Sequence, residues 1–177
     1  FEGVGADARR AQLLASGVGV AWALEAQELL KRDFGIVADV WSVTSWTELR
    51  RDGLHCDEQK FLHPGQDNPV PWVTQKLQGR PGPVIAVSDY MRQVQDQILN
   101  WVPQRFASLG ADGFGFSDTR AAARRFFHID GPSIVVRTLQ ELAAAGEVDP
   151  AWPAQAAEKY RLLDVTAGAS GTVGGDA

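Results

Sequence analysis

The sequence predicts an α/β fold of three layers, in which a mostly parallel sheet carries helices on both faces. Four short apolar runs alternate with segments of helical periodicity along the 177 residues, which is typical of successive βαβ units. Small or polar residues follow each run, as expected where strands end. Parallel strands place their carboxyl ends at one edge of the sheet, so loops that carry function are expected there.

Each expected strand leads into a helix. The strands are expected at residues 12–15, 36–43, 84–87 and 106–109. The helices are expected at residues 18–34, 47–51, 90–102, 119–127, 133–145 and 152–163, with a short one within 70–79. Met91, Val94 and Ile98 illustrate the apolar spacing of such a helix. The chain therefore has enough alternating elements for one doubly covered sheet.

Polar residues at the expected helix starts are predicted to act as N-caps. Ser45 precedes the helix after the second strand, Ser88 and Asp89 precede the one after the third strand, and Asp118 precedes the one after the fourth. A capping side chain accepts a hydrogen bond from a free N–H group of the first turn, which contributes about 1 kcal/mol.

The domain organisation follows from composition. Residues 1–11 are interpreted as a linker from a preceding domain, residues 12–164 as one domain, and the Gly- and Ala-rich residues 165–177 as a flexible tail. The segment from Cys56 to Gln78 has poor periodicity, and two alternatives stay open for it: an antiparallel edge strand or an excursion from the sheet.

Charge and composition exclude several classes of function. The net charge of −5 argues against binding to nucleic acid or to an anionic membrane surface, because both require a basic face. No window approaches the roughly 18 uncharged apolar residues that span a bilayer. The single cysteine, Cys56, rules out an internal disulfide and is compatible with a reducing compartment. A cytoplasmic location is expected.

The glycine-rich loop after the fourth strand is the most distinctive stretch of the sequence. Polar residues on a flexible backbone at this position form either a binding site or an interface. The candidates in and beside this loop are Asp112, Gly113, Phe114, Gly115, Ser117, Asp118 and Arg120. Ser88 and Asp89 are candidates in the neighbouring loop. A general acid or base among the carboxylates Asp39, Asp89, Asp112 and Asp118 stays open beside their capping role.

Known site motifs are incomplete in this sequence. Gly17 and Gly19 begin a dinucleotide fingerprint, but Trp22 stands where its third glycine belongs, so a tight strand-to-helix turn is favoured. No Gly-Lys-Ser or Gly-Lys-Thr phosphate loop occurs. His55 and His63 flank Cys56 without a further ligand pair, so no metal site is expected.

Nucleophilic catalysis is not supported either. Asp57 and Glu58 would raise the pKa of the Cys56 thiol, and no Gly-x-Ser-x-Gly elbow exists. Arg120, Arg124 and Arg125 form a basic stripe that suits a solvated surface or an interface. The tryptophans are candidates for anchors of a subunit contact, namely Trp41, Trp46, Trp72 and Trp101.

Taken together, these stretches resemble one known family, the carboxyl-terminal domain of the homodimeric pyruvate dehydrogenase decarboxylating component of bacterial type. The similar segments are residues 12–17, 39–49, 51–53, 88–91, 110–120 and 146–149. The resemblance extends over residues 11–164. It implies a transketolase-like parent with three α/β domains.

The resemblance also implies the chemistry of that parent. Such an enzyme decarboxylates pyruvate oxidatively on thiamine diphosphate with magnesium and acetylates the lipoyl group of the dihydrolipoyl acetyltransferase component. The motifs for cofactor, metal and catalysis belong to the amino-terminal and middle domains, so no catalytic, cofactor-binding or metal-binding residue is carried over to this chain. The expected partners are those two domains and the second subunit of a homodimer.

Three hypotheses follow. In the first, the chain is the terminal domain of the decarboxylating enzyme and is inactive alone. In the second, it is a non-enzymatic interaction module whose aromatic surface serves assembly. In the third, it is a regulatory or ligand-binding module with a small molecule at Ser88, Asp112 or Ser117.

Overall fold

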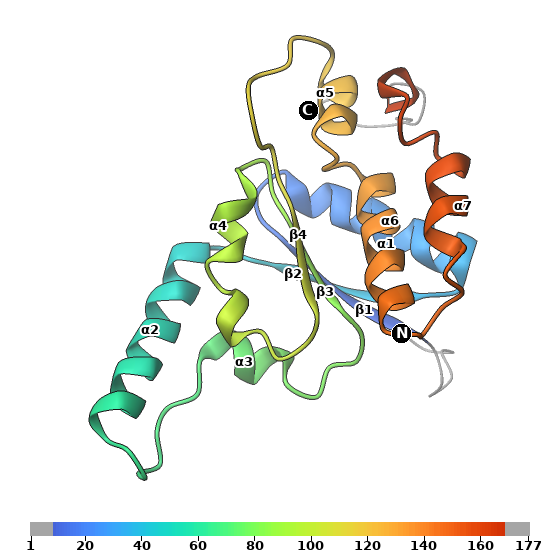
Figure 1. Ribbon diagram of the computed structural model, residues 1–177. Helices are drawn as coiled ribbons and strands as arrows, with labels where there is room; N and C mark the ends of the chain where they lie inside the picture. Colours follow the sequence, from blue (N-terminus) through green and yellow to red (C-terminus); the bar gives the residue numbers. More distant parts are fainter. Residues whose placement is uncertain (1–8, 169–177) are drawn as a thin grey trace.

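The computed structural model describes residues 9–168 and contains a four-stranded sheet surrounded by helices (Figure 1). The strands are β1 (Arg10–Ala15), β2 (Val37–Ser42), β3 (Val84–Val87) and β4 (Phe106–Leu109). The α-helices are α1 (Gly19–Phe34), α2 (Trp46–Leu62), α3 (Trp72–Leu77), α4 (Arg92–Asp96), α5 (Arg120–Phe126), α6 (Gly131–Ala144) and α7 (Trp152–Lys159). Two short 3₁₀ helices are η1 (Leu99–Trp101) and η2 (Val165–Gly168).

The sheet is parallel throughout, with the strand order β2-β1-β3-β4. Leu14 of β1 is in register with Trp41 of β2 and Ala86 of β3. The expected α/β class and parallel sheet are therefore confirmed. Within residues 9–168 no antiparallel edge strand joins this sheet, so that alternative for the segment after Cys56 is wrong.

Alternate residues of the strands bury opposite faces of the sheet, and each face has its own core. Leu13 of β1 contributes to the core formed with α1, α6 and α7. Its neighbour Leu14 contributes to the core on the other face, with Trp46 of α2, Leu77 of α3 and Ile98 before η1. Figure 1 shows α2, α3 and α4 on one side of the strands and α6 and α7 on the other. The predicted three-layer arrangement is confirmed.

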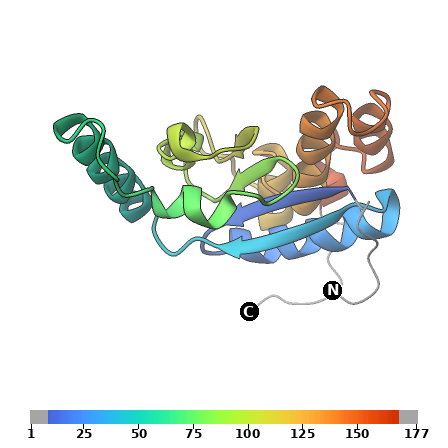
Figure 2. The ribbon, with the colours of Figure 1, turned by 90° about the horizontal axis from the view of Figure 1, so that it is seen from below.

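Helix α2 accounts for the first part of the segment with poor periodicity, and α3 accounts for another part of it. Helix α2 continues to Leu62 and ends at His63, whose N–H donates to Gln59 O at 2.9 Å. Of its seventeen residues only Trp46, Gly53 and Cys56 are buried, and Figure 2 shows the helix extending away from the sheet. A helix that is solvated on most sides shows little apolar periodicity, so the sequence pattern underestimated its length.

Other expected helices differ in extent as well; α7, for example, ends at Lys159 rather than at residue 163. The segment 90–102 forms the short helix α4 and then η1 rather than one continuous helix. Helix α6 begins at Gly131, earlier than expected, because Asp130 accepts a hydrogen bond from the N–H of Ser133 at 3.0 Å and caps it. Pro132 occupies its first turn, where a missing N–H costs nothing.

The domain boundaries also move slightly. Strand β1 begins at Arg10, so the predicted linker overlaps the sheet. The predicted tail begins too early, since Val165–Gly168 form η2 against α5; a Cβ built on Gly168 would lie 2.7 Å from Ala121 O. The rest of the predicted linker and tail, residues 1–8 and 169–177, lies outside the described residues. Within the described part no helix is long and apolar enough to cross a membrane.

Candidate functional site

The loops after the four strands meet at one edge of the sheet, here called the carboxyl edge. Trp46, which follows the β2 loop, donates its indole N–H to Ser16 Oγ in the β1 loop at 3.0 Å. In the loop after β4, Ala111 donates its N–H to Tyr90 O in the β3 loop at 2.8 Å. The predicted gathering of these loops is confirmed.

In dinucleotide-binding folds the ligand lies in a crevice at the strand ends, which here corresponds to the ends of β1 and β3. In this protein the backbone itself occupies that position. A Cβ built on Gly19 would lie 3.2 Å from Val87 O, so the first turn of α1 rests directly on the end of β3. Gly17 adopts a φ of 54°, which favours glycine and makes the tight turn. Trp22 is buried in the core below. This geometry fits the tight turn that the sequence favoured.

The loop after β3 does not cap a helix as predicted. Helix α4 begins at Arg92, and the side chain of its N-cap residue, Met91, makes no capping hydrogen bond. Ser88 is buried instead, and its hydroxyl accepts hydrogen bonds from the N–H of Tyr90 at 3.1 Å and from the amide of Gln95. Asp89 is exposed. The side chain of Ser88 therefore holds the turn between β3 and α4.

Asp112 fastens the loop after β4 to α4. Its carboxylate accepts the backbone N–H of Arg92 at 3.0 Å and also forms an ion pair with the guanidinium of Arg92. These hydrogen bonds from Arg92 lower the pKa of the Asp112 carboxyl below its usual value. The cap at the first residue of α4 thus comes from a loop that lies 20 residues further along the chain.

The tip of the same loop extends away from the sheet (Figure 1). Gly113 has a φ of 95°, a conformation that strongly favours glycine. Phe114 is 96% exposed. Nothing within the described residues approaches a Cβ built on Gly113 or Gly115. Neither glycine therefore makes a close backbone approach to another segment within the described part of the chain.

The start of α5 corrects another predicted cap. Thr119, not Asp118, is the N-cap, and its hydroxyl accepts the N–H of Ala122 at 3.2 Å. Asp118 accepts the N–H of Thr119 at 2.6 Å and so stabilises the turn before the helix. Ser117 and Arg120 are exposed.

The predicted basic stripe divides into different roles. Arg125 is buried, and its Nε donates to Asp130 Oδ2 at 2.6 Å. It also donates to the carbonyl oxygen atoms of Tyr160 and Arg161. Arg124 lies over the ring of Trp22, 5.3 Å from its centroid. Arg125 therefore joins α5, α6 and the end of α7 and is not part of a solvated stripe.

The four tryptophans that are candidates for contact anchors differ in their exposure. Trp46 is only 3% exposed and belongs to the core, so it cannot anchor a subunit contact. Trp101 is buried as well, with its indole N–H on Asp57 Oδ2 at 2.9 Å. Trp72 is 51% exposed and Trp41 is half-buried. Only these last two can present a ring to a ligand or partner.

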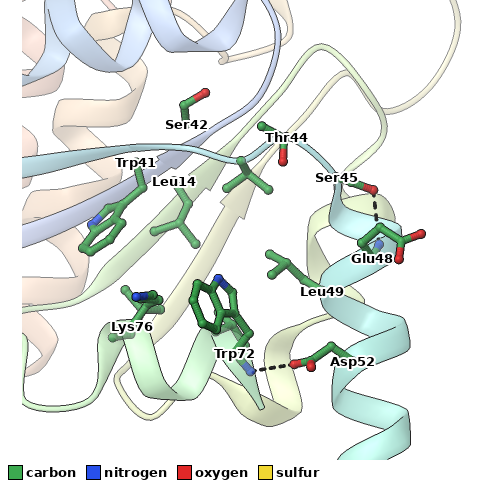
Figure 3. A pocket seen from close by; sticks show the side chains of 13 residues that line it. Leu14, Trp41, Ser42, Thr44, Ser45, Glu48, Leu49, Asp52, Trp72 and Lys76 are labelled. Atoms are coloured by element: carbon green, nitrogen blue, oxygen red, sulfur yellow. Dashed lines mark hydrogen bonds between the residues drawn. The ribbon is translucent and has the colours of Figure 1, made fainter.

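A cavity of about 480 Å³ lies beside Trp41 and Trp72, between the end of β2, the first half of α2, and α3 (Figure 3). Leu14, Val73 and Leu77 form its buried floor. The sequence indicates the two indoles as candidates but does not reveal this cavity. Its other walls depend on the angle at which α2 leaves the sheet, and no local sequence pattern specifies that angle.

The third group of candidates, around Cys56, has no catalytic geometry. Burial raises the pKa of the Cys56 thiol, and Asp52 and Asp57 raise it further. The predicted effect of Asp57 is thus confirmed, with Asp52 in place of Glu58 as the second carboxylate. Within residues 9–168 no group of three or more His, Cys, Asp or Glu side chains could hold a metal ion.

Comparisons with known proteins assign this fold to a family. A family model described as the transketolase-like TK C-terminal domain matches residues 3–130. Proteins called pyruvate dehydrogenase E1 component are 53% identical over 158 residues in Mycobacterium tuberculosis, 54% over 160 residues in Mycolicibacterium smegmatis and 40% over 154 residues in Escherichia coli K12. The alignments cover 89%, 90% and 86% of this chain and 17% of each relative.

A solved structure supports the fold. The protein titled "Split gene transketolase, inactive beta4 tetramer" superposes with a TM-score of 0.52 at 17% identity, covering 77% of this chain and 40% of that one. The chain thus spans a small part of the relatives that it matches, and that part includes the sheet and the carboxyl edge described above. Its sequence and its fold agree: the chain belongs to the transketolase-like C-terminal domain family.

Proposed function

We propose that this chain is the carboxyl-terminal domain of a thiamine-diphosphate-dependent pyruvate dehydrogenase decarboxylating component, and that the domain serves domain packing and dimer assembly without catalysis. The observation that carries the proposal is the 53% identity over 158 residues to a relative of that name. Identity at this level over most of the chain supports a shared role as well as a shared fold.

The carboxyl edge supports a role in assembly. Its loops and the adjoining end of α5 expose five large apolar side chains: Val18, Tyr90, Met91, Phe114 and Phe126. We call these five residues the carboxyl-edge surface. Soluble proteins rarely leave several large apolar side chains in neighbouring loops without a use, and such surfaces usually mark protein contacts.

Local contacts hold part of this surface in a defined shape. The ring of Phe126 stacks on that of Phe116, with 4.2 Å between their centroids, and the hydrogen bond from Ala111 to Tyr90 joins the loops after β3 and β4. A preorganised surface loses less conformational entropy when it binds. We assign the amino-terminal and middle domains of the parent enzyme and its second subunit as the neighbours of the carboxyl edge.

The cofactors belong to the rest of the parent enzyme. Thiamine diphosphate with magnesium requires a phosphate-binding segment and oxygen ligands for the metal ion. The described residues do not fit that group, because they hold no cluster of metal-binding side chains and their backbone fills the crevice beside Gly19. That this chain binds neither cofactor alone stays a prediction. We expect the acetyltransferase component to be a partner of this domain only through the parent enzyme, in the cytoplasm.

A chimera tests the proposal. In the Mycolicibacterium smegmatis relative, the segment that aligns with this chain is replaced by this chain, and pyruvate-dependent reduction of an electron acceptor is measured with thiamine diphosphate and magnesium. The chimera is expected to sediment as a dimer and to turn over pyruvate, whereas this chain alone is expected to be inactive. Turnover by the chain alone, or a chimera that folds but stays monomeric, contradicts the proposal.

A further inference from the structure

The cavity beside Trp41 and Trp72 has the size and lining of a small-molecule site. Its volume of about 480 Å³ lies within the range of roughly 300–1,000 Å³ that is usual for such sites. The floor of Leu14, Val73 and Leu77 is apolar and buried, while the indoles line the same cavity from β2 and α3 (Figure 3). An aromatic ring suits this space, because it buries apolar area and can stack on indoles.

Lys76 lines the α3 side of the cavity and Arg80 lies over the Trp41 ring, and neither has a carboxylate partner within the described residues. Lys76 Nζ lies 4.1 Å from the centroid of the Trp72 ring, and the guanidinium carbon of Arg80 lies 5.2 Å from that of Trp41. No carboxylate in residues 9–168 forms an ion pair with either. The positive charge at this end is therefore available to an anionic group of a ligand.

The carboxylates on the opposite wall are already engaged. Glu48 Oε1 lies 2.7 Å from Arg51 Nη1, and Asp52 Oδ2 accepts the backbone N–H of Trp72 at 2.6 Å. Figure 3 shows both acidic side chains on α2, across the cavity from Lys76. An anionic ligand group is therefore favoured at the α3 end and repelled at the α2 end, which gives the cavity a direction.

We propose that this cavity binds a small aromatic monocarboxylate, with its ring between Trp41 and Trp72 above Leu14 and its carboxylate facing Lys76 Nζ. The apolar floor and the indoles select the ring, and the unpaired ammonium selects the single negative charge. A second carboxylate on the ligand would lie near the Asp52 carboxylate and would be repelled by it. This site is separate from the carboxyl-edge surface and does not depend on the proposed role in assembly.

A titration with naphthalene-2-carboxylate tests the site. The probe is added to the 177-residue chain, and the indole N–H resonances are followed by two-dimensional NMR. Saturable shifts are expected for Trp41 and Trp72, with the Trp152 resonance on the opposite face unchanged. The neutral analogue naphthalene-2-carboxamide is expected to bind about threefold to fivefold more weakly, the factor for one exposed ion pair. Equal affinity for both compounds, or no saturable shift, overturns the proposal.

Two variants separate the site from general effects. Lys76→Gln is expected to weaken the carboxylate about threefold to fivefold and to leave the carboxamide unchanged, whereas Lys60→Gln, at an exposed position further along α2, serves as the matched control. Trp72→Ala is expected to weaken the binding of both compounds about tenfold or more. Because the Trp72 side chain is half exposed, the variant is expected to fold, and circular dichroism checks this. An equal loss in Lys60→Gln contradicts the assignment of Lys76.

One further measurement tests whether a segment of polypeptide, rather than a small molecule, occupies the cavity. The same titration is carried out on the full-length chimera. Binding of the probe to the chimera with the affinity seen for the chain supports a small-molecule site. Loss of binding in the chimera means that another segment of polypeptide fills the cavity, and this result overturns the proposal.

Discussion

At the scale of single residues, Asp33 fastens α7 to the end of α1. Its carboxylate accepts the Tyr160 hydroxyl at 2.7 Å and lies 3.0 Å from Lys159 Nζ and 2.8 Å from Arg32 Nη2. The hydrogen bonds from Arg32, Tyr160 and Lys159 hold the pKa of the Asp33 carboxyl well below its usual range. Burial and the bond to Asp33 raise the pKa of the Tyr160 hydroxyl.

Tyr160→Phe removes the hydroxyl without changing the ring. We expect it to lower the free energy of unfolding by about 1.5 kcal/mol at pH 7, because the lost hydrogen bond has a charged acceptor. Since the folded pKa of Tyr160 is raised, its contribution is complete below about pH 10 and is lost as the pH rises further. Urea denaturation should therefore show a difference between the two proteins that narrows above pH 10. A constant difference contradicts this linkage.

Asp33 makes the stability of the fold depend on pH in the acid range. Because the folded pKa of Asp33 is lowered, its contribution is present above about pH 4 and is lost as the pH falls through the lower folded value. We expect Asp33→Asn to be less stable at pH 7 and to lose less stability than the wild type between pH 4 and pH 2. Denaturant midpoints at several pH values measure this. Parallel acid profiles for the two proteins would exclude Asp33 as the titrating group.

Arg125 is the residue whose role was least visible in the sequence. It is 3% exposed and pairs with Asp130, which also caps α6. We expect Arg125→Met to destabilise the fold by about 3–5 kcal/mol, since it leaves a buried carboxylate without its partner. Arg124→Met, one position earlier, is the control and should cost less than about 1 kcal/mol. Thermal unfolding of both variants distinguishes the two arginines, which the sequence placed in one stripe.

At the scale of elements, the sequence predicted the strands better than the helix ends. The four apolar runs match β1 to β4 because most residues of β1 and β3 and the centres of β2 and β4 are buried or half-buried, as in a parallel sheet with helices on both faces. The cap of α4 could not be predicted, because Asp112 supplies it from another loop. The buried pocket floor was likewise invisible, since Leu14, Val73 and Leu77 meet only after α3 has packed on the sheet.

The middle of helix α2 packs closely against Trp101. A Cβ built on Gly53 would overlap the Trp101 ring, and Trp101 is held by its hydrogen bond to Asp57. We expect Gly53→Ala to destabilise the protein by about 1–3 kcal/mol despite the better helix propensity of alanine. Gly115→Ala is the control, because nothing lies near its Cβ position, and should stay within about 0.5 kcal/mol. Equal melting temperatures for the two variants contradict this packing.

At the scale of the whole molecule, the two faces of the sheet are closed by helices while its carboxyl edge remains apolar and exposed. The core therefore explains stability, and the edge is the surface that we propose for contacts with other proteins. The glycine-rich loop contributes Phe114 to that edge and is tied to α4 by Asp112. Substitutions at these two positions should consequently affect folding and assembly differently.

Phe114→Ala tests this separation in the full-length chimera. Because its side chain is 96% exposed, the variant should keep the stability of the isolated chain within about 0.5 kcal/mol, yet weaken dimerisation about tenfold or more if Phe114 is a contact anchor. Asp112→Ala should weaken dimerisation as well, but unlike Phe114→Ala it should also lower the stability of the isolated chain by about 1 kcal/mol, since α4 loses its cap and the loop loses its anchor on Arg92. Leu163→Ala, 98% exposed and outside the carboxyl edge, is the control. Sedimentation and thiamine diphosphate affinity are measured together; normal dimerisation with lost cofactor affinity would assign the loop to the cofactor site instead.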